Sequence, residues 1–532
     1  MNWHARALAA AVQSAAVAPT QSQSQSQAGG GANVFANYRP LPDTYDELFL
    51  TNGNARPNVA RLLDPLIRMG ADELAHRSEL AHLSLLNQGV TFSVYSDSAG
   101  VEKVFPMCPI PRVITASEWD TLERGLIQRT RALELFLADI YGEQAILKNP
   151  KIPADIIVGS DAYMPKLRGL EPPGGVRVHV GGIDLIRDGQ GVFRVLEDNL
   201  RCPSGVSYVL ENRVVTKRVF PELARRCRVR GVDTYPARLA DALRSVAPCP
   251  DHESLSVVLT PGAYNSAYFE HTFLARMMGV MLVEAADLFV DDDQVFAKTT
   301  QGPKRVHSIY RRTDESFLDP EVFRPDSMLG VPGIMRAYAK GNVALANAPG
   351  NGIADDKAIY PLVPEFIRYY LDEEPLLEQV PTYLCARPDD LAYVLDHLDR
   401  LVVKMVDQAG GYGMLMGPQA TRAERDEYAA KIRADPRKFI AQPRIELSTT
   451  PTWIPDKSCV EPRRVDLRPY VVSSPSGPWV LCGGLTRVAL VEGSYVVNSS
   501  QGGGSKDTWV LEDDDPDEPE AGGTLIEEMV EC

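Results

Sequence analysis

Residues Gly181–Asn199 carry the stretch GGIDLIRDGQGVFRVLEDN, from which the fold is predicted. The turn residues Asp188–Gly191 separate two apolar-rich runs, and this pattern predicts a β-hairpin. Pairing Arg187 with Val192 sets the expected register.

Three oxygen-bearing side chains lie on this hairpin. In the expected register Asp184 is opposite Val195, and the two-residue period of a strand places Glu197 and Asn199 on the same face as Asp184. The diagonal from Asp184 to Glu197 spans about 7–8 Å at the backbone, which two carboxylates can close around one or two hard cations such as Mg²⁺. A solvated acidic hairpin face is the alternative that the spacing leaves open.

A second motif, LVVKMVDQAGGYG, covers Leu401–Gly413. Lys404 falls inside an apolar strand, where an unpaired ammonium group would be costly, so we expect it to reach an anion. Gly410, Gly411 and Gly413 follow, and a glycine-rich loop lets backbone N–H groups approach phosphate oxygens. The motif lacks the G-K-S/T ending of a Walker A loop, and a flexible loop with an incidental lysine is the alternative.

Arginines and another glycine-rich segment follow nearer the C-terminus. Asp466-Leu467-Arg468 opens an apolar run, Trp479–Val488 is predicted to form a return strand that ends near Arg487, and Asn498–Lys506 is a polar loop. Guanidinium groups bind phosphate or carboxylate through two parallel hydrogen bonds, so these arginines are candidates for an anion clamp. Salt-bridged surface arginines are the alternative.

The remaining patterns predict an α/β protein. Helical spacing covers residues 58–88 and 115–147, and Thr115-x-x-Glu118 predicts a capping box at the start of the second helix. From Val176 onward, short β-branched runs alternate with glycine-rich turns and helical stretches.

One strand-to-helix corner is a candidate substrate site, because ligands of α/β sheets bind at the carboxyl ends of strands. A predicted strand over Ser254–Thr260 leads into a predicted helix over Tyr268–Gly279, and a further strand covers Val306–Tyr310. The candidate substrate-binding residues here are Tyr264, Asn265, Glu270, His271 and Arg311, which is followed by Arg312.

Composition excludes several classes of protein. The chain has 532 residues, of which 44% are apolar and 24% charged, as in soluble proteins with several domains. Glu512–Cys532 holds ten of the acidic residues and no Lys or Arg, so the other 511 residues carry -6 of the net charge of -16. We therefore expect no nucleic-acid partner, and without a run of about 18 apolar residues we expect no membrane span.

Cysteine and histidine spacing bears on redox state and metals. Eight cysteines form no C-x-x-C pair, so we expect reduced thiols and a cytoplasmic protein. The eight histidines show no zinc-binding spacing. The polar segment QSQSQSQAGGG at Gln21–Gly31 predicts disorder for residues 1–40, and the acidic tail 512–532 is predicted to be disordered too.

Together these segments resemble the ATP-grasp superfamily in its circularly permuted form, related to glutathionylspermidine synthase. Asp184, Glu197 and the E-x-N-x-R motif that ends at Arg201 resemble the magnesium-binding hairpin that normally ends the ATP-grasp domain. Here that hairpin precedes the lysines and the glycine loop, an order that identifies the permuted form.

Later motifs are similar to the rest of that domain. Asp355-Asp356-Lys357, Val380-Pro381-Thr382 and the strand of Lys404 resemble the ATP-binding lobe, and Phe439–Gln442 occupies the place of the strand that holds adenine. Asp466-x-Arg468, Arg487 and Asn498 with Gly502-Gly503 resemble elements of the branch that attaches amino acids to carboxylates.

The resemblance implies an α/β (α+β) architecture: a circularly permuted ATP-grasp fold with an inserted pre-ATP-grasp α/β domain and an N-terminal helical extension. The expected boundaries are 41–150 for the helical extension, 151–250 for the metal-binding part, 251–350 for the inserted domain and 351–511 for the ATP-binding lobe with the remainder of the ATP-grasp domain.

The resemblance also implies a reaction. ATP would phosphorylate a small-molecule or peptide carboxylate, and an amine would displace phosphate from the acylphosphate. Each group of residues has an implied role: Asp184, Glu197 and Asn199 bind Mg²⁺; Lys357, Lys404, Gly410, Gly411, Gly413, Gln442 and Asn498 bind ATP; Arg201, Arg468 and Arg487 stabilise developing charge. A non-catalytic ATP-binding sensor or scaffold and a kinase that releases a phosphorylated product are the alternatives.

Overall fold

The computed structural model describes residues 33–93, 102–249, 254–407, 413–498 and 502–512. The low-complexity segment and residues 513–532 of the acidic tail lie outside these ranges. The prediction of disorder up to residue 40 was wrong for residues 33–40, because Phe35 and Tyr38 are buried. Their rings pack on Phe49 at centroid distances of 5.7 and 5.0 Å, so this segment has the apolar surface that the Gln/Ser run lacks.

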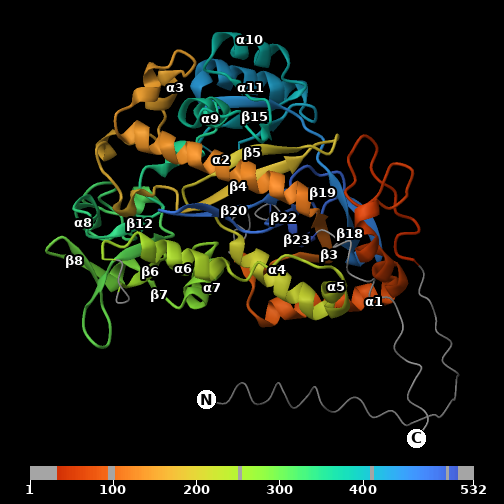
Figure 1. Cartoon of the computed structure of the whole chain (residues 1–532). Coiled ribbons are helices and arrows are strands. Elements are labelled where there is room, and N and C mark those ends of the chain that lie inside the picture. The colour runs from red at the N-terminus through yellow and green to blue at the C-terminus, as the bar shows by residue number, and fades with distance from the viewer. Residues whose placement is uncertain (1–32, 94–101, 250–253, 408–412, 499–501, 513–532) are drawn as a thin grey trace, which may run out of the picture.

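A ten-stranded sheet among the described residues forms the centre of the molecule (Figure 1). Its main path runs β13-β5-β4-β19-β22-β23-β3, with β18 beside β19 and with β20 joining β4 to β21. The strands are β3 (Met107–Ile114), β4 (Val180–Arg187), β5 (Phe193–Asn199), β13 (Glu378–Gln379), β18 (Thr449–Ile454), β19 (Cys459–Arg468), β20 (Tyr470–Ser474), β21 (Gly477–Val480), β22 (Leu485–Val488) and β23 (Gly504–Val510). The hairpin β4–β5 thus completes a sheet built largely from strands near the C-terminus.

The hairpin is present as predicted, but its register is different. Arg187 pairs with Phe193 instead of Val192, and an irregularity between Asp184 and Leu185 places Asp184 directly opposite Glu197. The turn is thus one residue longer than expected, and the β-bulge at Leu196 shifts the pairing by one more residue, which the regular two-residue period does not anticipate. The two carboxylates are therefore direct cross-strand neighbours instead of diagonal ones.

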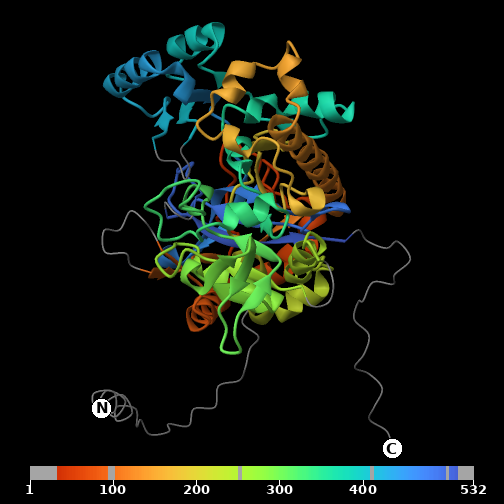
Figure 2. The same cartoon turned by 90° about the vertical axis from the view of Figure 1, so that its left-hand side faces the viewer.

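A smaller antiparallel sheet of order β14-β17-β15-β16 lies above the central sheet in Figure 1. Its strands are β14 (Tyr383–Leu384), β15 (Leu401–Met405), β16 (Leu415–Met416) and β17 (Phe439–Pro443), so the strands predicted around Lys404 and Gln442 are confirmed. Helices α10 (Pro388–Asp396) and α11 (Arg422–Ala434) bury Val394 and Ile432 against this sheet. Figure 2 shows this lobe at the opposite end of the molecule from the parallel α/β unit.

That unit is a four-stranded parallel sheet of order β12-β11-β6-β7. Its strands are β6 (Ser256–Leu259), β7 (Met281–Val283), β11 (Ser308–Arg311) and β12 (Ala344–Ala346), and its helices include α6 (Tyr235–Ser245), α7 (Tyr268–Met278) and α8 (Ile334–Ala339). A three-stranded sheet of β8 (Leu288–Asp291), β9 (Gln294–Ala297) and β10 (Lys304–Val306) extends from it. The strand predicted over Val306–Tyr310 is broken at His307 between β10 and β11.

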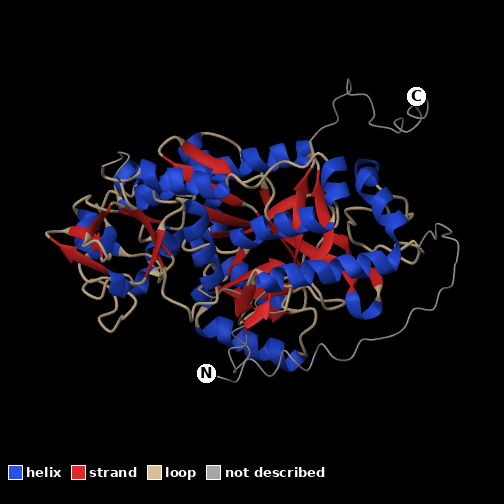
Figure 3. Cartoon of the chain, turned by 90° about the horizontal axis from the view of Figure 1, so that it is seen from below, coloured by secondary structure: helices blue, strands red, loops and turns tan. Residues whose placement is uncertain are grey.

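Long helices pack on the central sheet. Helix α2 (Ala116–Tyr141) begins at the predicted capping box of Thr115 and Glu118, and it contacts α9 (Val363–Leu371) through stacked rings of Phe136 and Phe366. Seen from below in Figure 3, other helices cross the strands; these include α1 (Ala60–Asn87), α4 (Val206–Val219) and α5 (Pro221–Arg226). Strand β3, between α1 and α2, was not predicted.

Two remaining features complete the described chain. A two-stranded sheet joins β1 (Thr91–Ser93) to β2 (Glu102–Val104), and the short helix α3 spans Ala154–Val158. Within the described ranges, each helix is too short or too polar to pass through a lipid bilayer.

Candidate active site

The acidic hairpin and the strand of Lys404 face one cavity, of about 180 Å³, between the central sheet and the smaller sheet. The predicted site residues that line it are Asp184, Glu197, Lys357, Lys404, Gln442, Arg487 and Asn498. We call this the nucleotide cavity, after the ligand that the resemblance in sequence leads us to expect there. The hairpin and the lysine strand, which are far apart in the sequence, thus meet at one site, as expected if both bind one nucleotide.

Asp184 is held by two arginines at the wall of this cavity. Arg468 donates from Nε and Nη2 to the two oxygens of Asp184, the latter at 2.8 Å, and Arg487 donates from Nη2 at 2.8 Å. Arg487 also forms a bidentate pair with buried Asp466. The guanidinium charges lower the pKa of the Asp184 carboxyl and keep it ionised, although burial opposes this. The buried cluster contains two carboxylates and two guanidinium groups and is neutral overall.

Two lysines reach the cavity from different segments. Lys357 lies 3.3 Å from a carboxylate oxygen of Glu197, and Lys404 donates a hydrogen bond of 2.8 Å to Oε1 of Gln442. Burial lowers the pKa of Lys404 to about 8; Glu197 and Asp184 oppose this shift, and Lys357 adds to it. Gln442 in turn donates to Thr382 at 2.9 Å, so its side chain orients Lys404.

Apolar side chains line the rest of the nucleotide cavity, and the sequence analysis missed them. They are Ile186, Leu196, Val380, Val402, Met414, Met416, Ile445, Leu447 and Val497. The sequence did contain a signal for two of them. Val402 lies two positions from Lys404 and Ile186 lies two positions from Asp184, so each is expected on the same strand face as a predicted site residue. An apolar slot beside lysines and a carboxylate suits a flat base attached to a charged phosphate chain.

The predicted glycine loop is only partly described. Gly410 and Gly411 lie outside the described residues. Gly413 has φ of 64°, a left-handed conformation that favours glycine, and it packs beside Met405.

A second, larger cavity of about 550 Å³ adjoins the first, and Lys357 lines both. We call this the polar cavity. Asn199, Arg201 and Arg468 line it among the predicted residues. Asp355 and Asp356, from the motif that resembles the ATP-binding lobe, also line it. Other lining residues, which the sequence did not single out, are Ser160, Ser204, Asp407 and Arg437.

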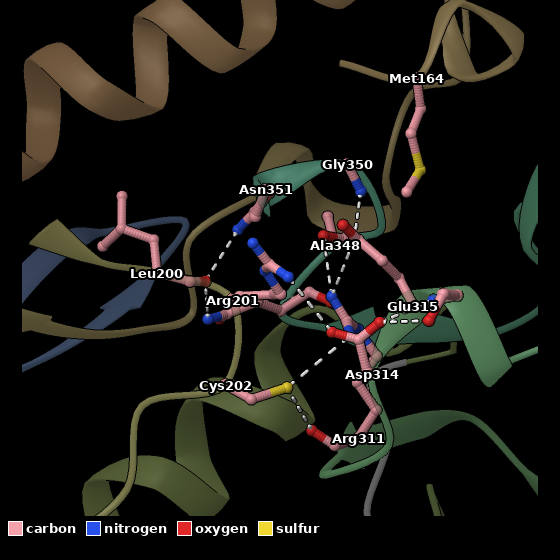
Figure 4. Close-up of polar contacts among 12 residues, drawn as sticks. Met164, Leu200, Arg201, Cys202, Arg311, Asp314, Glu315, Ala348, Gly350 and Asn351 are labelled. Carbon is pink, nitrogen blue, oxygen red and sulfur yellow. Dashed lines mark hydrogen bonds and ion pairs between the residues drawn. The ribbon is translucent and has the colours of Figure 1, made fainter. Parts of the chain in front are cut away.

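Arg201 lies where the polar cavity meets the parallel α/β unit (Figure 4). Its guanidinium group is 3.5 Å from Asp314 and 3.7 Å from Asp355, while its backbone N–H donates to Asp355 at 3.0 Å. Figure 4 shows Arg311 beside it, paired with Glu315 at 3.4 Å and in contact with Cys202. The pKa of the Arg201 guanidinium group is raised: burial lowers it, but three nearby carboxylates raise it by more.

The five candidate substrate-binding residues do not line either cavity. Tyr264 is fully exposed, and the Asn265 side chain accepts a hydrogen bond from the backbone of Ala267 in its own turn. His271 is buried against Thr260 at 2.9 Å, and burial lowers its pKa to about 2, so it is neutral near pH 7.

Glu270 and Arg311 are buried supports of the loop that follows β5. Glu270 accepts hydrogen bonds from the backbone of Gly205 at 2.7 Å and of Ser207 at 3.1 Å. Arg311 donates to the backbone oxygen of Asn347 at 2.7 Å. The corner therefore holds the loop that carries Arg201, and its polar groups are occupied by protein atoms.

All seven cysteines in the described part of the chain are free thiols, as predicted; Cys532 lies outside it.

Comparisons with known proteins identify the family of this chain. The model of the family described as circularly permuted ATP-grasp type 2 matches residues 111–489. A protein of Synechocystis is 55% identical over 468 residues, which cover 88% of this chain and 97% of that protein. A protein of Mycobacterium tuberculosis strain H37Rv is 52% identical over 485 residues, covering 90% of this chain and 87% of that protein.

Two further similarities involve proteins with names that suggest a reaction. A Frankia alni protein with the provisional name glutamate–cysteine ligase 2-3 is 44% identical over 476 residues; these cover 89% of this chain but only 54% of that protein. A solved structure, a glutathione synthetase-like effector from Globodera pallida in its apo form, aligns with a TM-score of 0.52 at 10% identity and covers 83% of this chain and 98% of that one, which shows a shared fold. The chain therefore belongs to the circularly permuted ATP-grasp family, and this membership implies that it uses ATP.

Proposed function

We propose that the protein is an ATP- and Mg²⁺-dependent ligase that joins a carboxylate to an amine through an acylphosphate intermediate. The observation that carries the proposal is the shared cavity of Glu197, Lys357 and Lys404, three charged side chains from distant segments. The adjoining polar cavity supplies space for a second substrate next to Lys357. The names of the Frankia and Globodera relatives point to the same class of reaction.

ATP would bind with its base in the apolar part of the nucleotide cavity and its phosphates at Lys357 and Lys404. Lys357 already pairs with the carboxylate of Glu197 there, so bound phosphate replaces one anion by another instead of meeting a bare charge. Lys404 is held by Gln442, and the charges of Glu197 and Asp184 favour its protonated form. Asn498 lines the same cavity and adds an amide that can donate to phosphate or ribose.

Glu197 and Asn199 fit a magnesium ion on donor chemistry. Glu197 presents a carboxylate to the nucleotide cavity, and Asn199 lines the adjoining polar cavity, where its amide oxygen can serve as a second oxygen ligand. Asp184 would join them only when its pairs with Arg468 and Arg487 loosen. In the described part of the chain no three His, Cys, Asp or Glu side chains gather as a metal site, which suits Mg²⁺, an ion usually held by one or two carboxylates and substrate phosphates.

Magnesium, when bound, would neutralise charge on the phosphate oxygens. Arg201 and Arg468, which line the polar cavity, would stabilise the negative charge that develops as the phosphoryl group moves to the carboxylate and as the amine attacks. A covalent protein nucleophile is not needed for this sequence of steps. The free thiols suit a reducing compartment, and we propose the cytoplasm.

The test is a substrate screen. Purified protein is incubated with ATP, MgCl₂, a pool of amino acids and dicarboxylates and a pool of amines, and phosphate release and product mass are measured. Phosphate release that depends on both pools, with a condensed product, is the expected result. ATP binding without turnover would identify a sensor instead, and a stable phosphorylated product would identify a kinase.

Glu197→Gln tests the metal assignment in the same assay. We expect turnover to fall at least about 100-fold while the protein stays folded, because the substitution removes charge at the phosphates without altering shape. The melting temperature should fall only by the loss of the ion pair with Lys357. Glu427→Gln, on the exposed surface of α11, is the matched control and should behave as wild type. Full activity of Glu197→Gln would rule out the metal role.

A further inference from the structure

Asp355 occupies a position in the polar cavity that the roles proposed so far leave unused. It ends the short helix η7 (Asn351–Asp355) and lines the polar cavity together with Lys357 and Arg201. Lys357 also lines the nucleotide cavity, so Asp355 lies close to the place where the two cavities meet.

The two oxygens of Asp355 have different surroundings. Oδ1 accepts the backbone N–H groups of Leu200 at 2.5 Å and Arg201 at 3.0 Å, which fixes the carboxyl group against the loop after β5. Oδ2 accepts no hydrogen bond from the described residues, and its nearest cation, Nε of Arg201, is 3.7 Å away. One oxygen therefore anchors the group while the other remains free for a ligand in the cavity.

The adjacent Asp356 shows the contrast. It also lines the polar cavity, but its Oδ1 accepts the backbone N–H of Ala358 at 2.8 Å and its Oδ2 accepts the hydroxyl of Ser160 at 2.5 Å. Both of its oxygens have protein partners, so Asp356 serves as a structural carboxylate beside a carboxylate with a free oxygen.

We propose that Asp355 is the general base that accepts a proton from the incoming amine through its free Oδ2. This inference rests on the proposed ligase function and adds a catalytic residue to it. The substrate ammonium group transfers one proton to Oδ2, and its nitrogen attacks the acylphosphate carbonyl carbon. The C–N bond forms, the C–O bond to phosphate breaks, and the departing phosphate takes the bonding electron pair and the second proton from nitrogen.

The charges around Asp355 suit this role. Burial raises its pKa to about 7, Glu315 adds to the shift, and Arg201, Lys357 and the N–H of Leu200 oppose it. Asp314, on the other side of Arg201, competes for the same guanidinium group. A carboxyl group with a pKa near the working pH is ionised often enough to accept a proton and basic enough to hold it.

Hydroxylamine provides a test that separates this step from the one before it. Hydroxylamine is uncharged at neutral pH, so it traps an acylphosphate as a hydroxamate without needing a base. Wild type, Asp355→Asn and Asp356→Asn are each assayed with ATP, MgCl₂ and the twenty amino acids as carboxylates, once with hydroxylamine and once with the amine pool. Asparagine at 355 retains an oxygen that can accept the two backbone N–H groups.

We expect Asp355→Asn to form hydroxamate at close to the wild-type rate and amide about 10²–10⁴-fold more slowly. Its residual amide formation should also lose the rise with pH around 7 that wild type shows. In Asp356→Asn the ratio of amide to hydroxamate should equal that of wild type.

Loss of both products in Asp355→Asn would overturn the assignment, because the residue would then be needed before amine attack. Retention of both products would overturn it as well. Absence of hydroxamate from wild type would instead contradict the proposed ligase function, so the two failures are distinguishable.

Discussion

Lys404 leads to a quantitative prediction for the pH dependence of nucleotide binding. Burial lowers its pKa to about 8 in the ligand-free protein, with Glu197 and Asp184 opposing the shift and Lys357 adding to it. Only the protonated ammonium form attracts phosphate. As pH rises above 8 the side chain loses its proton, so the affinity for Mg²⁺–ATP should fall as pH rises.

The size of the effect follows from the fraction of protein that carries the charge. At pH 7 nearly all Lys404 is protonated, whereas at pH 9 about one-tenth is, so the apparent Kd for ATP should rise about tenfold between these values. At pH 8 binding should take up about half a proton, since phosphate pulls the lysine back to its charged form. Calorimetric titration in buffers of different ionisation enthalpy measures both quantities.

Lys404→Arg is the matched variant, because arginine keeps its charge throughout this range. Its Kd should be nearly independent of pH from 7 to 9, whatever its absolute value. A wild-type Kd that does not change over this range would refute the reasoning, and so would an equal pH dependence in Lys404→Arg.

Three further predictions concern stability. Asp198→Asn removes the buried carboxylate that pairs with Arg129 through two hydrogen bonds of 2.6 and 2.7 Å. The free energy of unfolding in urea should fall by about 3–5 kcal/mol, and a double variant with apolar residues at both positions should recover most of this loss. Glu270→Gln weakens the hydrogen bonds to Gly205 and Ser207, so the free energy of unfolding should fall by about 1–3 kcal/mol while the Kd for ATP stays the same. A changed Kd with unchanged stability would show that Glu270 binds a ligand after all. Arg487→Met should lower the melting temperature more than Arg468→Met, because it leaves the buried carboxylate Asp466 without its bidentate partner; the reverse order would contradict the cluster described above.

The sequence was sufficient for the local structure that makes the site. Strand periodicity placed Glu197 on the cavity side of β5, and it places Asp198 on the other side, where it pairs with Arg129 of α2. The register failed for two reasons: the turn is one residue longer than expected, so that Arg187 pairs with Phe193, and a bulge opposite Asp184 inserts Leu196, which no periodic pattern encodes. Pairs such as Arg129 with Asp198, 69 positions apart, depend on how helices dock on the sheet, which the local pattern does not contain.

The substrate-binding assignment failed for a different physical reason. A strand-to-helix corner binds ligands only when its polar groups face solvent or a cavity. Here Tyr264 in the corner after β6 is exposed but lines neither cavity, while Glu270 accepts a hydrogen bond from the loop that follows β5 and Arg312 donates one to it. Burial of a charged group has to be compensated, and these contacts provide the compensation.

The arrangement of charges explains how the proposed phosphate site can be stable without its ligand. Arg468 lines the polar cavity, while its partner Asp184 lines the nucleotide cavity, so this ion pair belongs to the wall between them. Lys357, which lines both cavities, is likewise paired with Glu197. Each cation at this wall thus has a protein carboxylate to neutralise it when no phosphate is present. Asp184 and Glu197 are also the candidate magnesium ligands. When Mg²⁺ and ATP bind together, these carboxylates would exchange their protein cations for Mg²⁺, and the cations would exchange their carboxylates for phosphate.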